Sequence, residues 1–414
     1  EIIFNTYDFM TDTRLKELAE YGFDDVEISQ LRNALFEIAK QTLEHYDEIC
    51  EEDLRSLGQL TELRHELRKH SPLAETNVMK LYSYIDELLD SIKDHGTPQF
   101  TRQARCAFMA RSFCRTLVEK GYFTKQEMDD FMLSIPTVAS EFERDFDLYS
   151  HGKLSRDDFN HLYGHLRLGT YDIRSDSYRN IYFDVASANL TGNNKVKQEA
   201  KSLDLERLQV ALDEAGIPVT PEKFIEFIKK ATQNREYFKF EFTKSLSLML
   251  DVIVKLGEVM AIAREDMSYL EIQDLLSYHS RDSYIQTIET RRRFYHVNSY
   301  LVLPEVIFDV GDIDVIDIDE ARPNFITNKV VEAPIVNLDE DHDSDITGKI
   351  VVLTKADPGY DWIFAKDIAG FVTKYGGAAS HMAIRCAEFG IPAAIGCGEK
   401  IYQRIHRMQI MCLD

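Results

Sequence analysis

The hydrophobic and polar positions of residues 1 to about 300 follow a helical pattern. Apolar side chains recur three and four positions apart, as at Leu31, Leu35 and Ile38 of the stretch Leu31 to Leu67. This spacing places them on one face of an α-helix. Few prolines or glycines interrupt such stretches, so the pattern predicts a large, mostly helical domain over residues 1–300.

Two helix starts can be predicted within this domain. Thr220 followed by Pro221 combines a capping hydroxyl with a proline at the first helical position. It predicts a helix that runs to about Ile262. Ser268 and Glu271 have the spacing of a capping box and predict a second helix just after them.

Beyond residue 300 the pattern changes to short apolar and β-branched runs broken by Gly, Pro and Asp. The uninterrupted apolar run Ile350 to Leu353 is typical of a buried strand. The predicted strands are Val302 to Val315, Lys349 to Thr354, Ile368 to Thr373 and Ile391 to Gly396, with a helix from Ser380 to Phe389. The whole chain is therefore predicted to be multidomain, α plus α/β, with a small α/β domain over residues 301–414.

Composition narrows the function classes. The chain has 414 residues, of which 44% are hydrophobic, and a formal net charge of −23. An acidic surface argues against nucleic acid or an anionic membrane as the main partner. Six cysteines without CxxC or Cys/His spacing predict neither a disulfide framework nor a zinc site. A reducing cytoplasm fits this composition, and no apolar run approaches the roughly 20 residues of a membrane span.

The most informative chemistry lies in the run GGAASHMAI, residues 376–384. The pair Gly376-Gly377 allows the backbone to approach a phosphate closely, and Ser380 can cap a helix whose first residues include His381. Helix amides then face any anion on that imidazole, and a neutral imidazole is nucleophilic near neutral pH. The alternative interpretation is an ordinary glycine turn followed by a polar residue at a helix start.

The run Thr354 to Gly398, which includes this motif and Phe389-Gly390-Ile391-Pro392-Ala393, resembles the mobile domain of phosphoenolpyruvate-utilising enzymes. The resemblance implies a β/β/α phosphohistidine swivelling domain over residues 301–414, with His381 as the carrier and Gly376, Gly377 and Ser380 supporting the phosphoryl group. It also implies that an ATP-grasp domain upstream of Glu1 binds ATP and Mg²⁺. We expect the chain to be inactive without that domain.

The segment Tyr163 to Ile173 resembles a GHLRPGTYDI-type motif of the same family, with Leu168 at the usual proline. It predicts an acceptor site in the helical domain. Arg235 and Lys239, four residues apart on one helix face, form either part of that site or a solvated patch. The candidate substrate-binding residues are His165, Arg167, Tyr171, Asp172, Arg235 and Lys239.

Within the family the chain is most similar to L-glutamine kinases of capsule phosphoramidate biosynthesis. This implies transfer to the side-chain amide nitrogen of L-glutamine, giving AMP and phosphate. Arg167 would hold the α-carboxylate of the acceptor and Asp172 its α-ammonium group, with His165 or a metal ion activating the amide. No metal site is predicted in this chain itself.

Two alternatives to this function stay open. One is a kinase of the same architecture for another small molecule, similar to rifampin phosphotransferase or phosphoenolpyruvate synthase. The other is a non-catalytic binding module. A swinging carrier needs a flexible attachment, which we expect in Arg281 to Asn298 or in Asp317 to Asn328.

Overall fold

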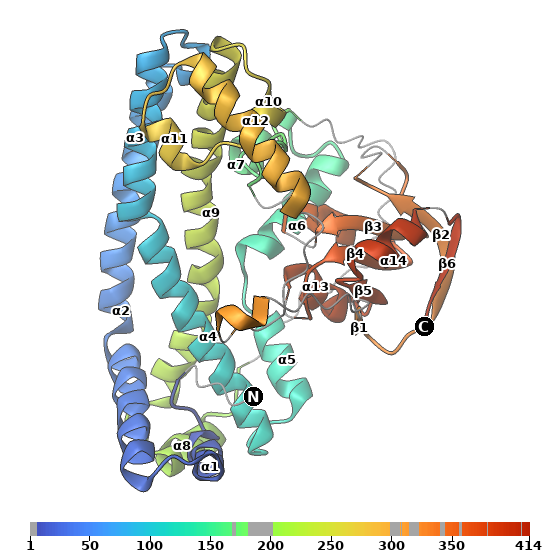
Figure 1. Cartoon of the computed structure of the whole chain (residues 1–414). Helices are drawn as coiled ribbons and strands as arrows, with labels where there is room; N and C mark the ends of the chain where they lie inside the picture. Colours follow the sequence, from blue (N-terminus) through green and yellow to red (C-terminus); the bar gives the residue numbers. More distant parts are fainter. Residues whose placement is uncertain are drawn as a thin grey trace. The chain divides into compact units, whose positions relative to one another are not determined.

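The chain is mostly helical and ends in a small mixed β-sheet (Figure 1). The computed structural model describes residues 6–167, 171–180, 202–298, 307, 309–313, 323–339, 344–355, 358–378, 380–406 and 408–414. It divides into two compact units. The first comprises Glu1–His70, Glu87–Phe142 and Asn193–Ser245, and the second comprises Ser71–Asp86, Glu143–Gly192 and Leu246–Asp414.

The helices of the described residues come in this chain order: α1 (Thr11–Glu17), α2 (Asp25–Lys69), α3 (Val78–His95), α4 (Thr97–Glu119), α5 (Lys125–Leu133), α6 (Val138–Ser150), α7 (Arg156–Tyr163), α8 (Leu205–Ala215), α9 (Pro221–Val259), α10 (Arg264–Met267), α11 (Ile272–Leu276), α12 (Arg281–Asn298), α13 (His381–Phe389) and α14 (Gly398–Ile405). Short 3₁₀ turns occur at Leu18–Tyr21, Pro72–Ala74, Val310–Ile313 and Pro358–Ala365.

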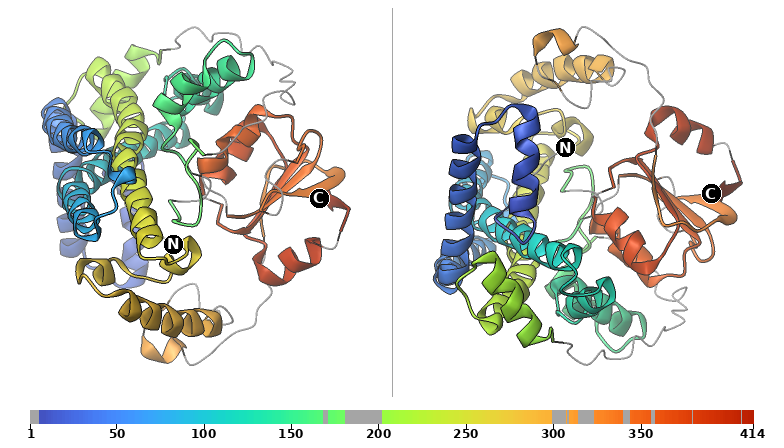
Figure 2. Two further views of the ribbon diagram at one scale, coloured as in Figure 1. Left: turned by 90° about the horizontal axis from the view of Figure 1, so that it is seen from above. Right: turned by 90° about the horizontal axis from the view of Figure 1, so that it is seen from below.

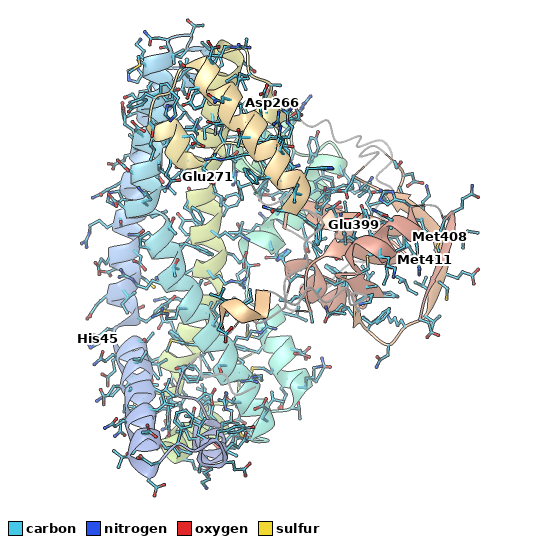
Figure 3. The ribbon with its side chains drawn as sticks, viewed as in Figure 1. His45, Asp266, Glu271, Glu399, Met408 and Met411 are labelled. Atoms are coloured by element: carbon cyan, nitrogen blue, oxygen red, sulfur yellow. The ribbon has the colours of Figure 1, made fainter. Side chains whose placement is uncertain are left out.

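Helix α2 contains the predicted helix Leu31 to Leu67 and extends beyond both of its ends. It begins at a capping box in which the Asp24 carboxylate accepts from the backbone amides of Val26 and Glu27. Its buried residues recur every three or four positions, which gives one inward stripe: Ala39, Leu43, Tyr46, Cys50, Asp53, Leu57, Leu60, Arg64 and Leu67. The helix is kinked at His45, which has a φ of −115° and a ψ of 16° (Figure 3).

Helix α9 begins as predicted. Pro221 is its first residue, and the hydroxyl oxygen of Thr220 accepts a hydrogen bond from the amide of Lys223 at 3.3 Å. The helix ends at Val259, three residues before the predicted Ile262.

The predicted capping box of Ser268 and Glu271 is wrong. The hydroxyl of Ser268 donates to the carbonyl oxygen of Glu265 and closes α10. Glu271 is itself the N-cap of α11, in a box with Asp274.

The core of the first unit is rich in aromatic side chains. Phe113 is fully buried and contacts Phe9, Phe224 and Phe227 at ring-centroid separations of 5.1–6.3 Å. Edge and tilted geometries of this kind stabilise a core beyond simple burial. These rings come from α4, α9 and the segment before α1, so they join sequence-distant elements.

A buried polar network lies in the same unit. Gln103 of α4 donates to the carboxylate of Asp53 and accepts from the hydroxyl of Tyr46, both at 2.7 Å. Asn234 of α9 adds donors to Tyr46 and Cys50. Because buried polar groups cost free energy unless they are paired, this network fixes how α2, α4 and α9 pack together.

The segment Arg281–Asn298 forms α12, so the flexible attachment predicted there is wrong. Two of its arginines make ion pairs with the preceding segment: Arg292 with Asp266, and Arg291 with Glu271 at 3.6 Å (Figure 3). Of the other predicted attachment, Asp317 to Asn328, residues 317–322 lie outside the described residues. The same holds for most of the predicted strand Val302 to Val315, of which Val310–Ile313 is a 3₁₀ turn.

The carboxy-terminal sheet has six strands in the order β1-β5-β4-β3-β2-β6. The bounds are β1 (Asn324–Ile326), β2 (Val331–Asn337), β3 (Ile350–Lys355), β4 (Gly370–Tyr375), β5 (Ala393–Ile395) and β6 (Ile410–Leu413). The four inner strands run parallel, and β1 and β6 are antiparallel edges. The predicted strands corresponding to β3, β4 and β5 and the predicted helix α13 are confirmed, whereas β1, β2, β6 and α14 were not predicted.

Helices cover both faces of this sheet (Figure 2). Val372 packs in a cluster with Tyr402 and Ile405 of α14. Phe371, which precedes Val372 in β4, points the opposite way. Its ring contacts that of Phe364, which stacks on Phe389 of α13. Since successive side chains of a strand alternate between faces, α14 covers one face and α13 the other. The carboxyl end of β4 leads through Gly376 and Gly377 to the start of α13.

Candidate functional site

His381 is the first residue of α13. Ser380 has extended backbone angles, φ −66° and ψ 154°, and its hydroxyl accepts from the amide of Ala383 at 3.4 Å. The His381 side chain is half-buried. The predicted capped helix start is thus confirmed, and His381 lies at the positive end of the α13 dipole, where an anion is favoured.

The turn before α13 depends on its two glycines. Gly376 directly follows β4 and has a φ of 126°, a left-handed conformation that favours glycine. A Cβ atom added to Gly377 would have no neighbouring atom within 4 Å, so the surroundings of Gly377 are open. The carbonyl oxygen of Gly377 accepts from the amide of Ser380 at 2.9 Å, which closes the turn onto the helix cap.

A second group of polar side chains lies at the carboxyl ends of β2 and β3 and was not predicted from the sequence. The Asp339 carboxylate accepts from the amide and hydroxyl of Thr354 at 2.5 Å and from the Tyr402 hydroxyl at 2.9 Å. Burial, together with the nearby Asp339 charge, raises the pKa of Tyr402. These bonds hold the ends of two strands and α14 together, and their partners are too distant in sequence for a motif to reveal them.

The basic side chain of α13 is Arg385, one turn after His381. Its guanidinium lies 4.8 Å from the ring centre of Phe389 and 5.7 Å from that of Phe364, and it pairs with Glu388 at 2.9 Å. The rings provide a platform for the cation.

The first part of the predicted acceptor motif, residues 164–167, pairs with residues 177–179 after α7, whereas residues 168–170 lie outside the described residues. The amide of Tyr178 donates to the carbonyl oxygen of Leu166 at 2.8 Å, and that of Arg179 to Gly164 at 3.3 Å. Arg167 and Ser177 form an antiparallel bridge next to the bond between Tyr178 and Leu166. The motif is therefore rigid at its base, with Tyr171 and Asp172 nearer its tip.

Arg167 anchors this paired segment to α9. Its guanidinium donates to the hydroxyl and carbonyl oxygens of Ser247, each at 3.1 Å, to the carbonyl of Ser175 at 2.6 Å, and to the carboxylate of Asp251. The side chain has no exposed surface. A bidentate clamp on a ligand carboxylate would require some of these bonds to break, so the predicted contact between Arg167 and a ligand stays a prediction.

The other residues of the motif differ in accessibility. His165 is 4% exposed. Tyr171 has a φ of 46°, an uncommon conformation for a residue with a side chain. Asp172 pairs with Arg174, and the hydrogen bond from Arg174 lowers the pKa of the Asp172 carboxyl. Arg174, which was not among the predicted residues, is half-exposed and faces solvent beside Asp172.

Arg235 and Lys239 lie in the first unit, whereas His165, Arg167, Tyr171 and Asp172 belong to the second. Arg235 pairs with Glu236 at 3.5 Å and lies 5.7 Å from the ring centre of Phe108. This is the geometry of a partly solvated patch. The role of Arg235 and Lys239 in an acceptor site stays a prediction.

The described residues contain no group of three or more His, Cys, Asp or Glu side chains placed to hold a metal ion. In the same part of the chain, no helix is long and apolar enough to cross a membrane. Cys397 is buried in the sheet core, and burial raises its pKa to about 11, so the thiol stays protonated and unreactive near neutral pH.

A comparison with known protein families found a match to the carboxy-terminal region of the chain. Residues 346–414 match the family described as PEP-utilising enzyme, mobile domain. The similarity to this family is thus limited to the region of the carboxy-terminal sheet from residue 346 onward. That match includes the whole Gly376–His381 turn, α13 and α14.

Two curated relatives are similar over a longer stretch. A rifampicin phosphotransferase of Bacillus subtilis is 28% identical over 222 residues, which is 49% of this chain and 24% of the relative. A rifampicin phosphotransferase of Bacillus cereus is 26% identical over 212 residues, 46% of this chain and 24% of the relative. The chain thus aligns with about a quarter of the length of the curated relatives it matches.

Proposed function

We propose that this chain is part of an ATP-dependent phosphotransferase in which His381 carries a phosphoryl group to a small-molecule acceptor. The observation that carries the proposal is the position of His381. It is the first residue of a Ser380-capped helix, directly after a glycine turn, within the region that matches the mobile domain.

In the first proposed step, an imidazole nitrogen of His381 forms a bond to the β-phosphorus of ATP. The bond from that phosphorus to the oxygen bridging the α-phosphate breaks, and AMP leaves. Water then releases the γ-phosphate as inorganic phosphate and leaves a phosphoryl group on His381. Finally the acceptor nucleophile takes this group, and the imidazole is restored.

The chain's own residues favour the phosphorylated form. His381 lies at the positive end of the α13 dipole, a short turn after the open backbone of Gly377, and both features would favour an anion on its imidazole. The imidazole is only half-buried, which lets a donor and an acceptor reach it in turn. Magnesium, which the family implies, finds no ligand cluster among the described residues, and no step proposed for this chain passes through it.

Two acceptors are candidates. L-glutamine is suggested by the motif around His165 to Asp172, where the Asp172 carboxylate would exchange its pairing with the half-exposed Arg174 for the ammonium group of the ligand. A rifamycin antibiotic is suggested by the names of the two curated relatives. We propose that either acceptor binds at the tip of the motif rather than at its base, because Arg167 at the base is already fully engaged.

The test uses the full-length gene product with MgATP and either L-glutamine or rifampicin, followed by phosphorus NMR. We expect AMP and one new phosphorylated product, both lost in His381→Asn. His406→Asn, which changes another histidine of the same sheet region, serves as the matched control and should retain both.

Each outcome has a distinct meaning. A phosphorus–nitrogen resonance with glutamine assigns the amide nitrogen as acceptor, and a phosphate ester with rifampicin assigns a hydroxyl. If AMP formation requires His381 but neither phosphorylated product appears, the carrier role of His381 stands and both proposed acceptors are rejected. AMP formation that is unchanged in His381→Asn would refute the carrier role.

A further inference from the structure

Two glycine backbones cross beside the carrier histidine. A Cβ atom built on Gly396 would lie 2.3 Å from the carbonyl oxygen of Gly376, far inside any tolerated contact. Gly396 follows β5 and Gly376 follows β4, which pair as parallel neighbours. Gly396 also has a φ of 77°, so both its conformation and its surroundings exclude a side chain.

Thr373, near the end of β4, ties the two loops together. Its carbonyl oxygen accepts from the amides of Gly396 at 3.1 Å and Cys397 at 2.8 Å. Its hydroxyl oxygen accepts from the amide of Gly396 at 3.1 Å as well. Thr373 is fully buried, so these bonds are shielded from competing water.

We propose that Gly396, held by Thr373, is a positioning residue for His381. The turn from Gly376 to His381 is short, and the carbonyl oxygen of Gly377 accepts a hydrogen bond from the amide of Ser380. A displacement of Gly376 therefore moves the helix cap and the imidazole with it. This inference rests on the proposed carrier function of His381 but assigns Gly396 no chemistry of its own.

The expected size of the effect follows from the contact. Relieving a 2.3 Å approach requires the Gly376 carbonyl to move by several tenths of an ångström or more. A misplacement of about 1 Å in a reacting group can cost about 10²-fold in rate. We therefore expect Gly396→Ala to slow phosphorylation of His381 at least about tenfold.

The experiment compares Gly396→Ala with Gly348→Ala in the full-length protein. Gly348 also has a left-handed φ, 68°, but a methyl group there meets no atom within 4 Å. The control therefore carries the same backbone cost without the clash. Phosphohistidine formation is followed by phosphorus NMR with two donors: MgATP, and phosphoramidate, which phosphorylates histidine chemically and needs no nucleotide site.

With both donors, Gly396→Ala should be slow and Gly348→Ala should keep the wild-type rate. With MgATP, the loss should appear in kcat while KM for ATP stays constant, because the substitution leaves the proposed nucleotide site unchanged. A Gly396→Ala protein that is phosphorylated by phosphoramidate at the wild-type rate would overturn the inference.

A second pair of variants covers the case in which Gly396→Ala does not fold. Thr373→Val removes the hydroxyl acceptor at nearly constant volume and should slow phosphorylation, whereas Thr373→Ser should restore it. Equal rates for the two variants would contradict the role of Thr373. If the wild-type protein reacts with phosphoramidate but forms no AMP from MgATP, the proposed function fails. The phosphoramidate rates of the variants then still decide whether Gly396 positions His381.

Discussion

Ser380 combines two effects at the start of α13 that substitution can separate. Its hydroxyl caps the helix through the amide of Ala383, and it lies beside the proposed phosphoryl group on His381. Ser380→Ala should lower the free energy of unfolding by about 1 kcal/mol through loss of the cap. Ser380→Asp keeps a capping oxygen but adds a negative charge next to the phosphoryl oxygens.

We therefore expect Ser380→Asp to retain wild-type stability in urea unfolding and yet to slow phosphorylation of His381. Ser380→Asn, which caps without charge, is the matched control and should stay close to the wild-type rate. If the aspartate and asparagine variants were phosphorylated equally fast, charge at this position would have no bearing on the carrier.

Arg167 is expected to contribute mainly to stability. Arg167→Met leaves the Asp251 carboxylate, which is 16% exposed, without its buried partner. The free energy of unfolding should fall by roughly 3 kcal/mol, as when one member of a buried ion pair is removed. Arg174→Met breaks the half-exposed pair with Asp172 and should cost less than about 1 kcal/mol.

Urea unfolding of the two variants measures this difference directly. A small effect of Arg167→Met on unfolding, combined with a large rise in KM for the acceptor, would instead assign Arg167 to the ligand. The role of Arg167 could not be read from the sequence because Asp251 lies 84 residues away. The capped helix start at His381 could be predicted because the glycines and the capping serine are all within six residues of it.

At the scale of elements, the packing of α2 against α4 and α9 depends on the buried carboxyl of Asp53. Burial raises the pKa of this carboxyl above its ordinary value, and the hydrogen bond from Gln103 offsets only part of that effect. At a pH between the pKa of Asp53 in the unfolded chain and its higher pKa in the folded chain, the folded chain holds more protons than the unfolded chain. The stability contribution of Asp53 is therefore fully present below about pH 4 and is lost as the pH rises through the folded pKa.

Asp53→Asn removes this dependence, since an amide does not titrate and its oxygen still accepts from Gln103. We expect the stability of the variant relative to wild type to increase with pH above about pH 4. Glu52→Gln, which changes an exposed neighbour that also faces Arg102, should show little such trend. Urea unfolding at several pH values tests both, and parallel curves for wild type and Asp53→Asn would contradict the assignment.

The helices and strands that were predicted correctly have a continuous apolar pattern, either along one face of a helix or through a whole strand. Helices α2 and α9 and strand β3 have that pattern, and each was predicted close to its observed bounds. Helix α12 has only two buried residues, Tyr284 and Ile288, and is supported by ion pairs with distant residues, so its sequence resembles a linker. Strand β2 contains Pro334, which usually argues against a strand.

At the scale of the whole molecule, alignment and fold differ in where the carboxy-terminal region begins. The family match starts at residue 346, but the sheet begins at β1, residue 324. The predicted boundary at residue 301 is earlier than both and stays a prediction.

The sheet predicts which of these boundaries gives a folding unit. Strand β2 is the neighbour of both β3 and β6, and within the described residues β6 pairs only with β2. A piece comprising residues 346–414 lacks β1 and β2, so β6 loses its pairing and β3 becomes an unpaired edge. It also loses Ala333 from the core that α14 covers.

We therefore expect residues 323–414 to unfold cooperatively in urea and to give dispersed amide resonances, whereas residues 346–414 should do neither. Residues 301–414 serve as the control and should match the stability of 323–414, since the sheet is complete in both. Exposed edges and a partial core favour aggregation over folding in the shorter piece. Cooperative unfolding of 346–414 would show that the first two strands are dispensable to the carrier fold.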